Sequence, residues 1–123
     1  MGRVYLSLGA LFGLTGVALG AFAAHGLKGR LTPAHLDAFQ TAVHYQQIHA
    51  LALLVVALLA QRTGNHLLDA AALLFSTGIV LFSGSLYLMT LVGWKLGPVT
   101  PLGGVLFMLG WACLGLAAWR RNA

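Results

Sequence analysis

Four long apolar stretches make up most of this chain, and they constrain its fold more than any other feature. They cover residues 4–24, 50–60, 67–92 and 102–119. A helix needs about 20 apolar residues to cross a bilayer, because each residue adds ~1.5 Å. Three stretches meet or nearly meet this length. The second does so only if its helix begins near Val43, which brings His44 and His49 into the membrane or to its border.

Polar residues are too few to cover the surface of a soluble protein of this size. The 123 residues are 59% hydrophobic and only 7% charged, whereas soluble domains carry roughly 25% charged residues. The chain has two acidic residues, Asp37 and Asp69. We therefore expect membrane lipid to be the solvent for most of the surface. The first stretch is long for the core of a signal peptide, so we expect it to be a permanent helix.

The seven Lys and Arg residues stand singly or in pairs at the ends of apolar stretches. This placement is typical of interfacial anchors, not of a nucleic-acid-binding patch. With four spans, both termini lie on one side of the membrane. That side carries Arg3, Arg62, Arg120 and Arg121, and the other carries Lys28, Arg30 and Lys95. The small excess favours cytoplasmic termini in a bacterial inner (plasma) membrane, with insertion in both orientations as the alternative.

These patterns predict an all-α fold, a membrane-spanning four-helix bundle in a single domain over residues 1–123. We expect helices at about 4–24, 33–61, 66–92 and 101–120. Thr32 and Pro33 form a cap-then-proline start for the second helix, whose first part is an amphipathic interfacial lead-in before the span from about residue 43. Thr100 and Pro101 repeat this pattern for the fourth helix, and Asn65 is a fair N-cap for the third.

Glycines recur along the first predicted helix, at Gly9, Gly13, Gly16 and Gly20. Small residues in lipid allow two helix backbones to approach closely. We expect these glycines to pack against a neighbouring helix of the same chain, and a dimer contact is the alternative.

Polar residues gather at the start of the second span and on one face of the third. The candidates for a polar cluster are His25, Gln40, His44, Tyr45, Gln46, His49, Ser83 and Tyr87. A polar group without a partner in hydrocarbon is costly, so we expect these groups to bond to one another and to the backbone. Ligand binding or a proton relay is the alternative, because ionisable groups at membrane depth often mark function.

The same residues indicate a hydrogen-bonded cluster more strongly than a metal or haem site. His44 and His49 are five positions apart, so they diverge by about 140° on a helix. His25 pairs with either only if the helices pack suitably, and Asp37 is the one acid nearby. The single cysteine, Cys113, lies in an apolar stretch without a partner. We therefore expect no cofactor and no metal.

Four stretches, taken in order, resemble a known family. They are "GAFAAHGL" (20–27), "FQTAVHYQQIHALALL" (39–54), "GIVLFSGSLYLM" (78–89) and "GPVTPLGGVLFMLGW" (97–111). Together they are similar to the domain-of-unknown-function 423 family, which includes proteins similar to eukaryotic transmembrane protein 256. The resemblance covers nearly the whole chain. It implies a small integral membrane protein with four helices and brings no reaction with it.

No Ser/His/Asp constellation, Gly-rich phosphate loop or paired carboxylate is visible in the sequence. We therefore expect a non-enzymatic membrane scaffold or accessory subunit, as a homo-oligomer or within a larger membrane complex, without nucleic acid. A small transporter or channel is the first alternative, because the polar face of the third helix would meet the His/Gln/Tyr cluster. A haem or metal-binding membrane protein is the second alternative.

Overall fold

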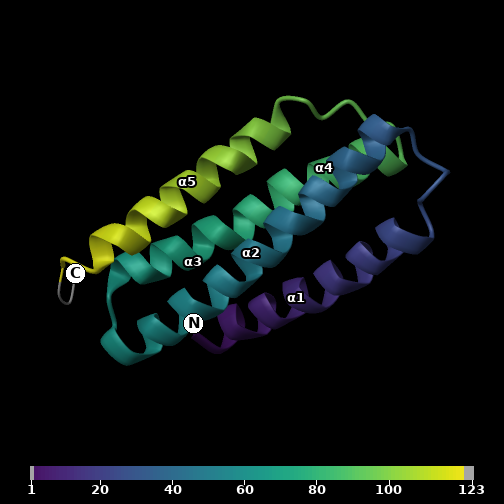
Figure 1. Ribbon diagram of the computed structural model, residues 1–123. Coiled ribbons are helices and arrows are strands. Elements are labelled where there is room, and N and C mark those ends of the chain that lie inside the picture. The colour runs from purple at the N-terminus through teal and green to yellow at the C-terminus, as the bar shows by residue number, and fades with distance from the viewer. Residues whose placement is uncertain (1, 121–123) are drawn as a thin grey trace.

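The computed structural model describes residues 2–120 and consists of helices joined by short connections (Figure 1). Helix α1 is Gly2–His25, and α2 is Pro33–Thr63. The third span consists of α3 (His66–Gly78), the π-helical turn η1 (Ile79–Ser83) and α4 (Gly84–Leu91), and the fourth is α5 (Val99–Ala117). These four spans are each long and apolar enough to cross a membrane. The expected all-α membrane-spanning bundle is confirmed.

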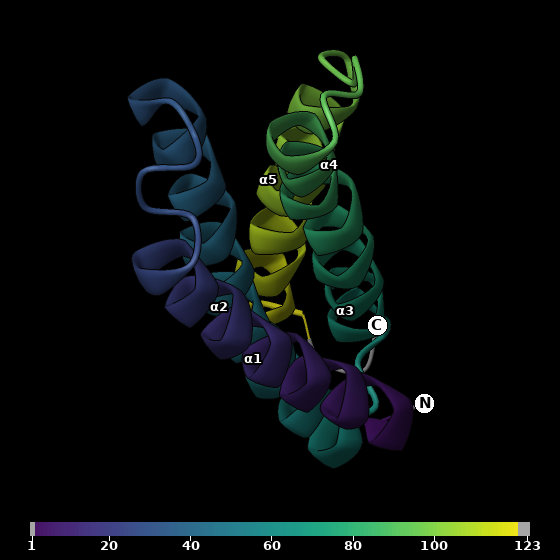
Figure 2. The ribbon, with the colours of Figure 1, turned by 90° about the vertical axis from the view of Figure 1, so that its right-hand side faces the viewer.

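The two middle spans form the centre of the bundle, and the first and last lie outside them (Figures 1 and 2). Half of the most apolar window of α2 is buried, compared with 17% in each of α1 and α5. Helix α1 packs on α2, while α5 packs on α3 and η1. The polypeptide therefore runs as two antiparallel helix pairs that join along α2 and α3.

The start of α1, the end of α5 and the α2–α3 connection lie at one end of the bundle (Figure 1). A Cβ atom added to Gly2 would touch the side chain of Gln61, at the end of α2. The side-chain amide of Asn65 donates to the carbonyl oxygens of Ala117 (3.3 Å) and Arg120 (2.8 Å). These contacts hold the start of α3 against the end of α5.

Two of the three predicted helix starts have the expected caps. The Thr32 hydroxyl accepts a hydrogen bond from the backbone N–H of His35 at 3.2 Å, with Pro33 as the first helical residue. Asn65 Oδ1 accepts from the N–H of Leu67 at 2.9 Å. The amphipathic lead-in continues without a break into the second span, and Gly64 ends α2 in the left-handed conformation at φ 67°.

The predicted start of the last helix is wrong. Helix α5 begins at Val99 after Pro98, and Thr100 lies inside its first turn. The Thr100 hydroxyl is hydrogen-bonded to the Ser85 hydroxyl across the connection. The Thr100 hydroxyl therefore bonds to a residue of α4 and does not cap α5.

Glycines of the first span form the contact surface with α2, as predicted. A Cβ at Gly9 would lie 2.7 Å from Leu54, one at Gly16 would lie 3.0 Å from Gln47, and one at Gly20 would lie 3.3 Å from Val43. Each of these glycines therefore lets the two helix axes approach. Gly13 points elsewhere, since no described atom lies within 4 Å of a Cβ built on it.

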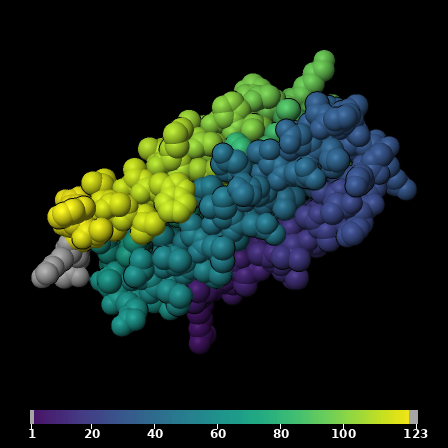
Figure 3. All heavy atoms as spheres, viewed as in Figure 1, coloured from purple at the N-terminus to yellow at the C-terminus, as the bar shows by residue number. Residues whose placement is uncertain are grey.

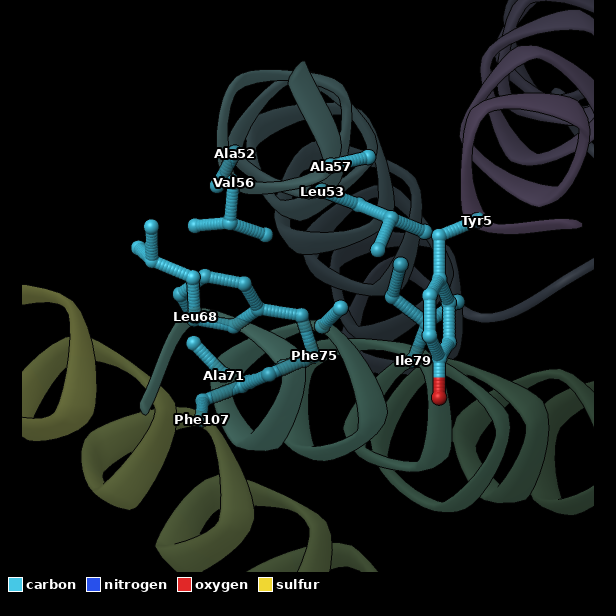
Figure 4. Close-up of a cluster of buried hydrophobic side chains, with 11 residues drawn as sticks. Tyr5, Ala52, Leu53, Val56, Ala57, Leu68, Ala71, Phe75, Ile79 and Phe107 are labelled. Atoms are coloured by element: carbon cyan, nitrogen blue, oxygen red, sulfur yellow. The ribbon is translucent and has the colours of Figure 1, made fainter. Parts of the chain in front are cut away.

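Aromatic side chains fill glycine slots between α3 and α5. The Phe75 ring would lie 2.6 Å from a Cβ on Gly110, and the Phe107 ring would lie equally close to one on Gly78. Each ring thus takes the space that a side chain on the opposite helix would need. Both rings belong to the main core cluster, where side chains from α1, α2, α3, η1 and α5 meet (Figure 4).

The outer faces of the helices are apolar. Leu14 on α1 is 69% exposed, Leu51 on α2 is 66% exposed and Met108 on α5 is 65% exposed. Figure 3 shows one face of the molecule, with α1 and α5 along opposite edges. Exposed apolar side chains on so many helices are compatible with a lipid solvent.

Candidate functional site

Two clusters of hydrogen-bonded side chains lie in the interior of the bundle. The first, called here the Gln46 cluster, consists of Gln46, Thr15, Tyr87 and the carbonyl of Phe12. The second, called the His49 cluster, consists of His49, the carbonyl of Tyr45, and the side chains of Trp111, Phe75 and Phe107. Gln46 and His49 are one helical turn apart on α2, and they face different neighbouring helices.

Gln46 joins three spans through one side-chain amide. Its Nε2 donates to the Phe12 carbonyl at 2.9 Å and to the Thr15 hydroxyl at 2.8 Å, both on α1. Its Oε1 accepts from the Tyr87 hydroxyl on α4 at 2.6 Å. Only 3% of Gln46 is exposed. Helices α1, α2 and α4 are therefore held together by a buried hydrogen-bonded network.

The local sequence explains how the amide reaches α1. Gly16 lies opposite it, and a Cβ there would come within 3.6 Å of Gln46 Nε2. The small residue thus leaves room for the amide beside the α1 backbone. The Thr15 hydroxyl donates a hydrogen bond to the Leu11 carbonyl at 2.9 Å, so it accepts from Gln46 while it donates within α1.

His49 joins α2 to α5, and both of its ring nitrogens have partners. Nδ1 lies 2.8 Å from the Tyr45 carbonyl oxygen, which can only accept, so Nδ1 carries the proton. Nε2 accepts from the indole N–H of Trp111 at 2.9 Å. This is the hydrogen-bond pattern of the neutral Nδ1–H tautomer, because a proton on Nε2 would face the indole donor.

Aromatic rings surround the His49 imidazole. The Phe107 ring stacks on it at a centroid distance of 3.6 Å and an interplanar angle of 10°. The rings of Phe75 and Trp111 lie at 5.5 and 5.7 Å, at steeper angles. Only 3% of His49 is exposed. The histidine is therefore part of the packed core.

The serine and threonine hydroxyls of the third span bond to backbone carbonyls. Ser83, at the end of η1, donates to the Ala42 carbonyl of α2 at 2.7 Å. Ser76 donates to the Ala72 carbonyl at 2.8 Å, within α3. Within residues 2–120, no buried side-chain nitrogen or oxygen atom lacks a hydrogen-bond partner. Ser83 therefore connects the third span to α2, while Ser76 bonds within its own helix.

Several of the predicted cluster residues are not brought together. His25, Gln40 and His44 are exposed, at the end of α1 and along α2. The Tyr45 ring is 39% exposed and packs on Phe82 at 4.8 Å. Three members of the predicted set thus belong to the two clusters. Tyr45 packs on a phenylalanine, and Ser83 bonds to the backbone of α2. The other three are exposed.

Two partners were missed by the sequence interpretation, Thr15 and Trp111. Thr15 is the one polar side chain between residues 8 and 24. Trp111 lies in the middle of the last apolar stretch, away from the borders where tryptophan is common. An indole N–H or hydroxyl at that depth needs an acceptor, and this need is the signal that could have identified both residues.

The geometry favours helix association over metal chemistry. His49 uses both ring nitrogens in hydrogen bonds, so neither is free to bind a metal in this arrangement. Among residues 2–120, no three side chains of His, Cys, Asp or Glu come together as a ligand group. The two clusters instead connect each outer span to α2.

Comparison with known proteins shows the same kind of molecule. A family described as "Protein of unknown function (DUF423)" matches residues 19–104. UPF0382 membrane protein YwdK of Bacillus subtilis is 45% identical over 118 residues, which are 94% of this chain and 96% of that protein. UPF0382 membrane protein SAB0533 of Staphylococcus aureus is 41% identical over 119 residues, 96% and 97% of the two chains. The search of solved structures found no match.

Proposed function

Because this chain belongs to the DUF423 family, a family of unknown function whose relatives are bacterial membrane proteins, we propose a function from the geometry of the structure. We propose that the protein is a non-enzymatic membrane scaffold or accessory subunit. The observation that carries the proposal is how the interior polar groups are used. Gln46 and His49 each bond to a neighbouring span, and the Phe107 ring stacks on His49. Such groups stabilise one arrangement of helices and leave the apolar outer faces for contact with other membrane components.

The outer faces of α1 and α5 are the surfaces available to a partner. Each outer helix contacts the bundle along one side and exposes the other. The most exposed large hydrophobic side chains are Leu14 on α1 and Met108 on α5. Helix association in lipid depends on close packing and not on the hydrophobic effect. A partner subunit, or a second copy of this chain, would therefore bind through the shape of these faces.

Photo-crosslinking in the native membrane tests the proposal. A photoreactive amino acid at position 14 or 108 should give a discrete protein adduct, while the same residue at Leu53, which is fully buried, should give none. Mild-detergent purification of the tagged chain should recover the same partner. A lone monomer with lipid adducts alone would refute the proposal, as would ion or proton flux through liposomes that is lost in His49→Ala.

For localisation, we propose the bacterial inner membrane, with the chain termini in the cytoplasm. Arg3, Arg62 and Arg120 lie at the end that contains the α2–α3 connection, and Arg121 is outside the described residues. Lys28 and Arg30 follow α1, and Lys95 follows α4, so all three lie at the opposite end. With Arg121 added from the sequence, the count is four cations against three, and this excess supports cytoplasmic termini.

Reporter fusions check this orientation. A fluorescent protein fused after the C-terminus should fluoresce, and alkaline phosphatase at that position should be inactive. Active phosphatase fusions would place the termini outside, and equal activity of both reporters would indicate insertion in both orientations.

A further inference from the structure

A pocket with a cationic rim opens at the end of the bundle where the α2–α3 connection meets the end of α5. Its volume is about 550 Å³. Apolar walls are formed by Leu59, Leu68, Leu114 and Ala117, and the polar rim by Arg62, Thr63, Asn65 and Arg120. Figure 3 shows α5 (yellow) beside the α2–α3 connection (teal) at this end.

Two guanidinium groups on this rim are not neutralised by a side-chain carboxylate. In residues 2–120, the ion pair formed is His66–Asp69 at 4.0 Å, so neither Arg62 nor Arg120 has a carboxylate within that distance. The partial charges of the helix ends offset one another here, because the ends of α2 and α5 are negative and the starts of α1 and α3 are positive. The two guanidinium groups therefore make the pocket rim net cationic.

We propose that this pocket binds an anionic membrane phospholipid, with its phosphate between Arg62 and Arg120 and an acyl chain along the apolar walls. Guanidinium groups bind phosphate oxygens through paired, charge-assisted hydrogen bonds. Basic pockets between membrane helices are suited to anionic headgroups. The apolar walls and the cationic rim together match a molecule that has an acyl chain and an anionic headgroup.

The dimensions and the position select a lipid over a free phosphate ion. A free ion would contact the rim and leave the leucine and alanine walls uncovered, whereas a phospholipid would cover both. Asn65 spans this end by bonding to the carbonyl of Arg120, so the segment that carries the second arginine is held in place. The pocket at the opposite end, about 450 Å³, is lined by one lysine, Lys95, and by His35. It lacks the paired guanidinium groups.

Lipid retention during purification tests the site. The protein is reconstituted with phosphatidylglycerol and phosphatidylcholine, purified in mild detergent, and its bound lipids are counted by native mass spectrometry. Wild type should retain phosphatidylglycerol, and Arg62→Gln/Arg120→Gln should bind it about 30-fold more weakly. The matched control Lys28→Gln/Lys95→Gln removes the same charge at the other end and should retain it.

The same experiment distinguishes the possible sources of phosphate. Inorganic phosphate, added at matched ionic strength, should not displace the lipid. Equal retention by the arginine double variant and wild type would overturn the site, equal loss in both double variants would indicate general electrostatics, and displacement by inorganic phosphate would indicate an anion site without an acyl chain.

A measurement on the unaltered chain makes the result independent of variant folding. Photoreactive phosphatidylglycerol should crosslink to the segments that contain Leu59 and Leu114, in excess over photoreactive phosphatidylcholine. Adducts spread evenly over the outer faces of α1 and α5 would overturn the proposal, because they would report lipid that surrounds the whole bundle.

Discussion

Replacement of Gln46 by leucine should destabilise the bundle more than any other single exchange of an uncharged polar residue for an apolar one on α2. The change keeps the approximate volume of the side chain and removes all three of its hydrogen bonds, to Phe12, Thr15 and Tyr87. It thereby disconnects α1 and α4 from α2 at one position.

The magnitude follows from the partners that remain. Inter-helix hydrogen bonds in membrane proteins average about 0.6 kcal/mol each, so three give about 2 kcal/mol. The Tyr87 hydroxyl loses its one acceptor, which costs about 1 kcal/mol more. Thr15 keeps its bond to the Leu11 carbonyl. We therefore expect Gln46→Leu to lower the free energy of unfolding by about 3 kcal/mol.

The pairwise part is measured by a double-mutant cycle with Tyr87→Phe. Once the tyrosine hydroxyl is gone, the leucine at position 46 leaves no orphaned donor on α4. The double variant should then be about 1 kcal/mol more stable than the two single effects predict when added. Unfolding is followed by circular dichroism in mixed micelles as the fraction of denaturing detergent increases.

Gln47→Leu is the matched control. Gln47 is the next residue on α2, is half-buried, and makes no side-chain hydrogen bond within the described part of the chain. It should change the unfolding free energy by less than about 0.5 kcal/mol. An effect of Gln46→Leu no larger than that of Gln47→Leu, or strict additivity in the cycle, would refute the assigned network.

Two further variants test the α5 contacts by the same unfolding assay. Gly103→Ala should lower the free energy of unfolding by about 1–3 kcal/mol, because its Cβ would lie 2.8 Å from the Cα and Cβ of Phe82. The control Gly104→Ala meets no atom closer than 3.8 Å and should be tolerated. Equal effects of the two variants would contradict the close approach of α5 to Phe82. Trp111→Phe should cost about 1 kcal/mol, since it leaves His49 Nε2 without its donor, and a variant as stable as wild type would contradict that bond.

Local patterns in the sequence were sufficient for the architecture. Apolar stretches predicted the four spans, the second of them with its lead-in from about residue 43. The Thr32–Pro33 pattern and Asn65 predicted two helix starts that the structure confirms. These features depend on residues close together in the chain, and each has a direct physical cause in hydrocarbon solvation or in an unpaired backbone N–H. The same kind of pattern failed at Thr100, where a hydroxyl 15 residues away offered a competing bond.

Helix periodicity predicted which residues share a face of a helix, but it did not predict which neighbouring helix that face contacts. It placed Gln46 and His49 among several polar residues on α2, and it gave no reason to connect them to Thr15, 31 positions away, or to Trp111, 62 positions away. It also grouped His44 with them, although His44 is exposed. Which helix lies opposite each face depends on how glycines and aromatic rings fit between spans.

The amino-acid sequence by itself therefore determined that this chain is a four-helix membrane protein and where its spans begin and end to within a few residues. The tertiary structure alone decided which polar groups are partners and which point outward. The physical reason is that lipid acts on every apolar residue alike, whereas a hydrogen bond between spans forms only where close packing brings a donor and an acceptor within about 3 Å.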